Sequence, residues 1–237
     1  FKNCNSLTSI TIPEGVTSIG GSAFSECSNL AMVNFGENSQ LTRIGADAFR
    51  YCHSLTSITI PSSVTSIGSQ AFNDCYALAE VYNYSNLTIT AGSSSNGYLG
   101  QYAKVVYNAS DLIEEKPETR ITVVENVQYY DYGDDFIALA PISGNVTEAT
   151  LDNRTTEINQ YAFYYCDSLT SITILEGVTS IGEYTFTGCS SLTSITIPDS
   201  VTSIGESAFW DCSRLATIRI NATTPPTLGS FAIPDNV

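Results

Sequence analysis

Residues 190–212 read SSLTSITIPDSVTSIGESAFWDC, and the chain repeats this sequence several times. Close copies fill residues 5–27, 53–75 and 167–189, and a looser copy fills 28–52. The cysteines mark the period: successive spacings are 23, 25, 23, 91, 23 and 23 residues, and each cysteine follows a phenylalanine by three positions. A fixed period of about 20 to 50 residues indicates a solenoid. Its coils stack because one coil cannot bury its apolar edge alone.

The sequence of each coil predicts two short strands and one turn. In Leu192-x-x-Ile195-x-Ile197 the side chains alternate, which places both isoleucines on one side of a strand and the polar residues on the other. Residues 201–204 are rich in β-branched side chains and predict a second short strand. The segment 207–211 predicts one helical or 3₁₀ turn that buries the phenylalanine. The predicted fold class is a repeat solenoid, mainly β, with short strands and helical or 3₁₀ turns.

The pattern LxxIxIPxxVxxIGxxAFxxC resembles the leucine-rich repeats of the BspA-like bacterial surface antigens, a variant first noted in a Treponema surface protein. The resemblance covers roughly residues 1–107 and 146–237. It implies a right-handed leucine-rich-repeat superhelix. It also implies a cell-surface or secreted adhesion protein that binds host or microbial partners and has no catalytic activity.

The period divides the chain into three parts. Residues 1–107 form a first repeat block with a degenerate last coil, and residues 146–237 form a second block. Residues 108–145 lack the repeat and predict a polar linker followed by a β-hairpin, with its turn at 133–135. We expect the three parts to form one continuous elongated unit.

The charge balance limits the partners. The net charge of −15, from 24 acidic and 9 basic residues, argues against nucleic acid and anionic membranes. The sequence contains no signal peptide and no long apolar run, so we expect no membrane insertion. The chain opens inside a repeat, which predicts a piece of a longer cell-surface or secreted protein, with the export signal and anchor outside it. We expect this piece to be a monomer.

The sequence contains little that indicates a catalytic site or a metal site. The seven cysteines fill one interior column, which favours buried free thiols over disulfides or a metal site. Cys52 and His53 are adjacent and could suggest a thiol–imidazole pair, but the cysteine belongs to the inward column. Asp131, Asp134 and Asp135 lack the spacing of a calcium loop and predict a solvated turn. We expect no enzyme activity and no catalytic, cofactor or metal site.

Two features are candidate partner-binding surfaces. Outward Ser and Thr side chains follow the first strand of each coil, and they could either bond along the ladder or contact a ligand. Residues 76–165 hold 12 of the 14 tyrosines, which could serve as binding hot spots or as core. The predicted contact residues are Glu80, Tyr82, Tyr84, Tyr129, Tyr132, Thr150, Thr173 and Thr196.

Three functions follow from these features. The first is an adhesion module that binds a protein or glycan of the host matrix or of other microbes. The second is a structural spacer that projects other domains of a longer surface protein, which the near-identity of the regular coils favours. The third is an appendage that positions a hydrolase domain located elsewhere.

Overall fold

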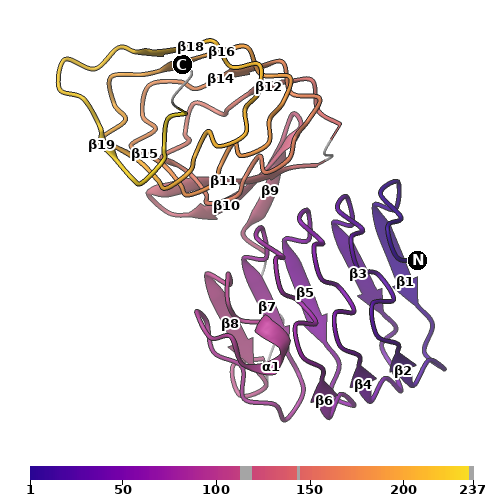
Figure 1. Ribbon diagram of the computed structural model, residues 1–237. Helices are drawn as coiled ribbons and strands as arrows, with labels where there is room; N and C mark the ends of the chain where they lie inside the picture. The colour runs from indigo at the N-terminus through magenta and orange to yellow at the C-terminus, as the bar shows by residue number, and fades with distance from the viewer. Residues whose placement is uncertain (113–118, 143–144, 235–237) are drawn as a thin grey trace. The chain divides into compact units, whose positions relative to one another are not determined.

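The computed structural model describes residues 1–112, 119–142 and 145–234 (Figure 1). Its contacts divide the chain into two compact units, unit 1 (Phe1–Thr119) and unit 2 (Arg120–Val237), which are described separately. In both units short strands recur coil after coil, and the described residues contain a single helical element. The predicted mainly-β repeat solenoid is therefore confirmed.

Unit 1 has two rows of parallel strands. The long strands are β1 (Ser9–Ile12), β3 (Met32–Phe35), β5 (Ser57–Ile60), β7 (Glu80–Asn83) and β8 (Val105–Asn108). The short strands are β2 (Ser18–Ile19), β4 (Arg43–Ile44) and β6 (Ser66–Ile67), and α1 (Ser95–Tyr98) is one distorted turn. Each long strand lies beside the same strand of the next coil (Figure 1). The repeat therefore becomes a ladder.

Unit 2 repeats this arrangement. Its long strands are β12 (Glu148–Thr150), β14 (Ser171–Thr173), β16 (Ser194–Ile197) and β18 (Thr217–Ile220). Its short strands are β13 (Glu157–Ile158), β15 (Ser180–Ile181), β17 (Ser203–Ile204) and β19 (Thr227–Leu228).

The predicted hairpin is confirmed and extends the short-strand row of unit 2. It consists of β10 (Val127–Tyr132) and β11 (Asp135–Pro141), with β9 (Ile121–Val124) paired to the outer side of β10. β11 pairs in parallel with β13, so one seven-stranded sheet runs from β19 to β9. The hairpin thus continues the stack and closes one end of its core.

Phenylalanine and cysteine form the centre of each core. The Phe24 and Phe49 rings stack with centroids 5.2 Å apart, and the Phe186 and Phe209 rings stack at 5.3 Å. These spacings follow the roughly 4.8 Å rise between stacked strands. All cysteines are free thiols, and every one except Cys4 is buried. The predicted interior column is confirmed.

The turn that holds each phenylalanine differs from the predicted helical or 3₁₀ turn. Residues two positions before and after the ring are left-handed, as at Ser22 (φ 55) and Glu26 (φ 64). Ser22 N–H donates to Ala46 O at 2.8 Å, and Glu26 N–H donates to Arg50 O at 2.7 Å, in the next coil. A helix would direct these N–H groups along its own axis. The alternating backbone instead bonds one coil to the next.

Candidate functional site

The outward side of the long strands is a regular polar surface in unit 2. Alternation buries Ile172 and Ile195 and turns their neighbours outward. The strand face of unit 2 consists of eight exposed residues: Glu148, Thr150, Ser171, Thr173, Ser194, Thr196, Thr217 and Arg219. The register pairs Thr150 with Thr173 and Ser194 with Thr217. Like side chains therefore stand side by side from coil to coil.

Hydroxyl ladders form at a different position in the coil. Thr179 Oγ1 donates to Thr156 O at 3.0 Å, and Thr202 Oγ1 donates to Thr179 O at 3.1 Å. In unit 1 the hydroxyl of Thr65 donates to Thr42 O at 3.1 Å in the same way. These threonines precede the short strands, where each hydroxyl reaches a carbonyl of the preceding coil. The ladder satisfies structural bonds between coils.

The strand-face hydroxyls do not form such a ladder. Within the described part of the chain, the side chains of Thr150, Thr173 and Thr196 make no hydrogen bond to protein. Each exposed hydroxyl thus keeps one donor and two acceptor positions for water or a ligand. Of the two uses predicted for the Thr-x-Thr rows, bonding along the ladder is not what these three residues do.

Glu80 and Tyr82 lie on the corresponding face of unit 1, but they are buried. The exposed fraction is 0% for Glu80 and 1% for Tyr82. Tyr82 Oη donates to Glu80 Oε2 at 2.8 Å, and Thr119 Oγ1 donates to the same oxygen at 2.7 Å. The Tyr82 ring stacks on Tyr107 of β8, with centroids 5.2 Å apart. Burial raises the pKa of Tyr82, and its hydrogen bond to Glu80 acts in the same direction.

The prediction that Glu80 and Tyr82 contact a partner is therefore wrong, because both side chains are buried. The regular coils carry small hydroxyl side chains at these positions. This coil carries a carboxylate and a large ring, which bond to each other. Tyr84 follows β7 and is partly exposed, so it stays a candidate.

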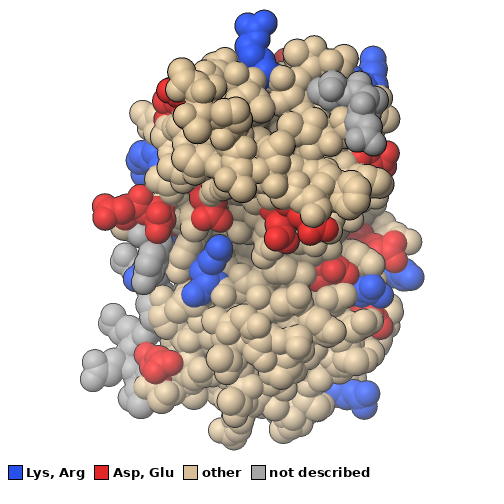
Figure 2. Space-filling view, turned by 60° about the vertical axis from the view of Figure 1, so that its left-hand side comes forward, with Lys and Arg blue, Asp and Glu red and all other residues tan. Residues whose placement is uncertain are grey.

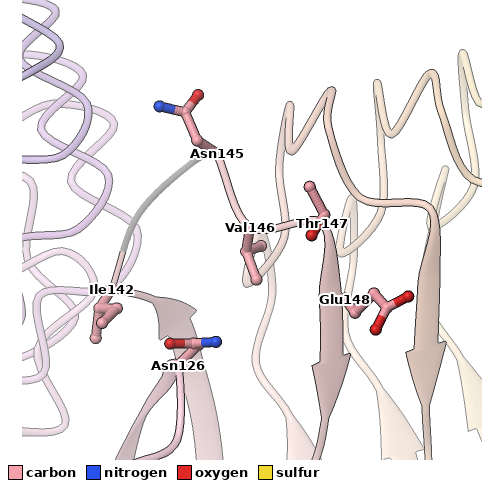
Figure 3. Close-up of a pocket in the computed structure, with 6 residues that line it drawn as sticks. All are labelled: Asn126, Ile142, Asn145, Val146, Thr147 and Glu148. Atoms are coloured by element: carbon pink, nitrogen blue, oxygen red, sulfur yellow. The ribbon is translucent and has the colours of Figure 1, made fainter.

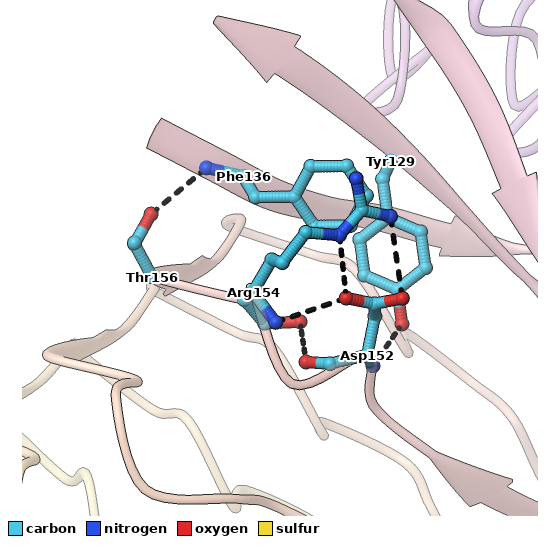
Figure 4. A network of polar contacts seen from close by, with 6 residues as sticks. Tyr129, Phe136, Asp152, Arg154 and Thr156 are labelled. Carbon is cyan, nitrogen blue, oxygen red and sulfur yellow. Dashed lines mark hydrogen bonds and ion pairs between the residues drawn. The ribbon is translucent and has the colours of Figure 1, made fainter. Parts of the chain in front are cut away.

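Tyr129 is also a core residue. Its ring stacks on Phe136 with centroids 4.6 Å apart, and its hydroxyl accepts the N–H of Asp152 at 3.0 Å (Figure 4). The Arg154 guanidinium lies 4.0 Å over the Phe136 ring and pairs with Asp152 at 2.9 Å. This ion pair lowers the pKa of Asp152. The network fastens the hairpin to the first coil of unit 2.

These contacts correct the prediction that Tyr129 binds a partner: its ring is 0% exposed. Tyr132 pairs with Asp135 through the backbone at the end of β10, and its side chain lies outside the described residues. The tyrosine-rich middle of the chain thus supplies core at Tyr82 and Tyr129.

A hollow of about 280 Å³ lies beside β12 (Figure 3). It is lined by Asn126, Ile142, Asn145, Val146, Thr147 and Glu148. Figure 3 shows the amides of Asn126 and Asn145 on different sides of it. Small-molecule sites typically measure about 300 to 1,000 Å³. At about 280 Å³ the hollow is smaller than such sites, so the adjoining strand face, which shares Glu148 with it, is the larger candidate surface.

The cysteine–histidine pair does not form a nucleophilic site. The Cys52 thiol donates to Phe24 O at 3.3 Å, and burial raises its pKa well above 9.0. The His53 ring stacks on Tyr76 at 5.2 Å, and burial lowers its pKa to about 4. At neutral pH both groups are uncharged, so they do not provide a thiolate and an imidazolium. Among the described residues, no group of three or more His, Cys, Asp or Glu side chains could hold a metal ion.

Two exposed aromatic residues were not predicted as contacts. Tyr165 and Trp210 are 51% and 54% exposed at the turns of unit 2. Both follow a buried phenylalanine within two positions, where the side chain leaves the core. The position in the repeat could have identified them. The predictions instead followed the tyrosine count of the irregular segments.

The comparisons with known proteins agree with the repeat. A model of the BspA type leucine rich repeat region matches residues 1–101 and 142–233, in six copies. A search of curated proteins finds no match.

Three solved structures from bacteria are similar. The pneumococcal vaccine antigen PcpA is 21% identical with a TM-score of 0.49, and the match covers 95% of this chain and 59% of PcpA. A leucine-rich repeat protein from Eubacterium ventriosum is 27% identical with a TM-score of 0.47, covering 94% and 56%. A leucine rich cell surface protein from Faecalibacterium prausnitzii is 22% identical with a TM-score of 0.37, covering 92% and 80%. The chain thus spans less than two thirds of the first two proteins.

Proposed function

Because the chain belongs to the BspA-type leucine-rich repeat family, we propose that it is a non-catalytic binding module of a cell-surface or secreted protein. In this proposal the strand face of unit 2 contacts a protein or glycan of the host matrix or of other microbes. The module acts as a monomer and uses no cofactor. The family match supports a surface-associated repeat module, and the strand face supports the binding role.

The observation that supports binding most directly is the row of unbonded hydroxyls. Thr150, Thr173 and Thr196 stand on strands whose positions are fixed by the ladder, so a partner need not order them first. Pre-organised polar groups lose little conformational entropy on binding. A hydroxyl can donate and accept, which suits the hydroxyl and amide groups of glycans and peptide backbones.

The charge of the chain limits the kinds of partner that it can bind. The net charge of −15 disfavours nucleic acid and anionic lipid. Figure 2 shows a face of the molecule on which most surface atoms belong to uncharged residues. No helix in the described ranges is long and apolar enough to cross a membrane. The strand face carries six hydroxyl residues with one Glu and one Arg, so we place an uncharged polar ligand first for it.

A structural spacer is the second candidate function. Ser171 and Thr173 on β14 recur as Ser194 and Thr196 on β16. Because a specific site usually differs from coil to coil, this identity favours a repeated structural element. In the spacer reading, the ligand-binding part belongs to another domain of a longer protein.

Binding to an immobilised panel of extracellular-matrix proteins and glycans tests the proposal. The wild-type chain runs beside Thr173→Val/Thr196→Val, which removes two hydroxyls and keeps the β-branched shape. We expect saturable wild-type binding that falls about tenfold in the variant, since each lost hydrogen bond contributes about 0.5–1.5 kcal/mol. Equal binding by the variant would exclude the strand face. A folded wild-type chain that binds no panel member would favour the spacer.

A further inference from the structure

The turns of unit 2 form a second exposed surface, separate from the strand face. The turn edge consists of residues 161–167, 183–190 and 206–214, which follow one another in successive coils. Its buried side carries the stacked Phe163, Phe186 and Phe209 rings. Its outer side carries Tyr165 and Trp210, each more than half exposed. The two residues lie two coils apart, and Trp210 packs edge-on against Phe231 with centroids 6.0 Å apart. Large exposed aromatic side chains often mark an interaction site.

The Tyr165 ring is held in place by its surroundings. Tyr165 is left-handed (φ 53), and its ring lies over Gly188, where an added Cβ would come within 2.7 Å of the ring. Tyr164 packs against the ring edge-on with centroids 4.6 Å apart, and Tyr164 in turn packs against Tyr161 at 5.3 Å. Gly188 and Tyr164 therefore support part of the Tyr165 ring, and about half of the side chain stays exposed to a partner.

Two carboxylates accompany these aromatic rings. Asp167 follows Tyr165 by two positions, and Asp211 follows Trp210 directly. Both are exposed, and within the described residues neither has a hydrogen bond or an ion pair through its side chain. Partial burial and the nearby charge of Asp211 raise the pKa of Asp167. The two carboxylates thus repel each other, and a cation between them would relieve that repulsion.

In unit 1 a comparable set of aromatic and acidic groups surrounds an arginine of the chain itself. There the Arg50 guanidinium lies 4.6 Å from the centre of the Tyr51 ring and pairs with Asp47 at 3.6 Å and Asp74 at 3.5 Å. Arg50 and Tyr51 follow the buried Phe49 directly. At this turn of unit 1, the aromatic and acidic groups therefore already contact an arginine of the same chain.

Unit 2 keeps the aromatic and acidic groups but lacks this arginine. Tyr165 has the same position in its coil as Tyr51. Asp211 has the same position as Asp74, but it lies two coils after Tyr165, whereas Asp74 lies one coil after Tyr51. The position of Arg50 is occupied by Tyr164. Unit 2 also carries 14 Asp and Glu against four Arg and no Lys, so its field attracts cations.

We propose that the turn edge of unit 2 binds an arginine side chain presented by a basic segment of a partner protein. The guanidinium lies against the exposed rings of Tyr165 and Trp210 and pairs with Asp167 and Asp211. Arginine fits better than lysine because its planar group stacks on aromatic faces and bonds two carboxylates at once. This site goes beyond the strand face and takes a ligand of different chemistry.

The fluorescence of Trp210, the only tryptophan in the chain, provides the measurement. The probe is an acetylated and amidated Gly-Arg-Gly-Arg-Gly peptide, titrated into the full chain at low salt. The matched probe carries citrulline, which has a similar shape but no charge. We expect a saturable fluorescence change with the arginine peptide that weakens as salt is added, and none with the citrulline peptide.

Variants locate the site. Asp167→Asn/Asp211→Asn should weaken peptide binding about three- to tenfold, because the two ion pairs are exposed and individually weak. Glu183→Gln removes an exposed carboxylate of the same edge and should change binding less than twofold. The strand-face variant Thr173→Val/Thr196→Val should bind the peptide like wild type.

Three results would overturn the proposal. One is an equal response to both peptides, and another is full binding by the Asp167→Asn/Asp211→Asn variant. The third is loss of peptide binding in the strand-face variant while its circular dichroism is unchanged. In that case arginine would be a ligand of the strand face, and the turn edge would have no role.

Discussion

A glycine recurs at one position of the regular coils, and from the second coil of a stack onward it lies against the backbone of the preceding coil. At Gly45 an added Cβ would lie 2.6 Å from Gly21 N and 2.7 Å from Gly20 C, both backbone atoms. At Gly20, the corresponding residue of the first coil, nothing lies within 4 Å. A glycine at this position could serve a tight bend. The structure shows that the close approach of two backbones is the stronger requirement.

The pair gives a matched test. Gly45→Ala should lower the free energy of unfolding by about 1–3 kcal/mol, because backbone atoms cannot move aside cheaply. Gly20→Ala should change it by no more than about 0.5 kcal/mol. Urea denaturation of both variants measures the difference. Equal effects at the two positions would show that the glycines serve the bend alone.

The buried thiols predict an alkaline loss of stability. Burial raises the pKa of Cys166 and Cys212 to about 12, from an ordinary value of 9.0. Above pH 9 the unfolded chain loses these protons while the folded chain keeps them. The free energy of unfolding should therefore fall between about pH 9 and 12, by up to about 1.4 kcal/mol per pH unit for each thiol.

Urea denaturation at a series of pH values checks this, with Cys166→Ala/Cys212→Ala as the control. The variant removes both titrating groups, so its stability should fall less steeply with pH. If its slope equals that of the wild type, the thiols are not responsible.

At the scale of the element, the hairpin is part of the stack and not an appendage. β11 pairs with β13 in the same parallel sense as β13 with β15. Tyr129 and Phe136 bring two rings into the core of unit 2 at this end. The contacts of Tyr129, Asp152 and Arg154 hold the hairpin against the first coil.

This role predicts how Tyr129 responds to substitution. Tyr129→Ala should lower the free energy of unfolding by about 3–5 kcal/mol, as is typical of a deleted core aromatic. Tyr129→Phe should cost about 1 kcal/mol, because the bond from the Asp152 N–H to the hydroxyl is lost while the ring remains. Thr150→Ala on the strand face should be nearly neutral. A small effect of Tyr129→Ala on urea denaturation would show that the ring is not core.

The strands could be predicted because the same alternating pattern occurs in several coils. Ile195 and Ile197 alternate with polar residues, and the cysteine period fixes where each coil begins. The left-handed turns could not be predicted. Ser22 and Glu26 have ordinary side chains, and their conformation is set by bonds to the next coil. Local propensity carries no information about such bonds.

The candidate site was harder to predict for a similar reason. Alternation correctly turned Thr150, Thr173 and Thr196 outward. It gave the same direction for Tyr82, but long-range contacts with Tyr107 and Thr119 decide the burial of that coil. The hydroxyl ladder at Thr179 depends on the distance between coils, which the sequence does not state.

At the scale of the whole molecule, the chain divides into the compact units Phe1–Thr119 and Arg120–Val237. The division into two repeat blocks around an insertion at 108–145 remains a prediction. In a solenoid each coil contacts only its neighbours, so a local defect weakens mainly the stack that contains it. We propose that each unit has its own stability.

Hydrogen exchange measured by mass spectrometry tests this proposal. Gly45→Ala should lower amide protection in the coils of unit 1 and leave that of unit 2 unchanged. Gly205→Ala, whose added Cβ would lie 2.4 Å from Glu183 N, should do the reverse. Loss of protection throughout the chain in both variants would show a single cooperative unit.

We propose that the strand-face hydroxyls contact a ligand, whereas the ladder hydroxyls stabilise the fold. The most direct measurement compares Thr173→Val/Thr196→Val with Thr179→Val/Thr202→Val, for both panel binding and free energy of unfolding. The first variant should lose about tenfold in binding with stability unchanged. The second should lose about 1–2 kcal/mol of stability, through its bonds to Thr156 O and Thr179 O, and keep its binding. Full binding by the first variant, or selective loss of binding in the second, would show that the strand-face hydroxyls do not contact the ligand.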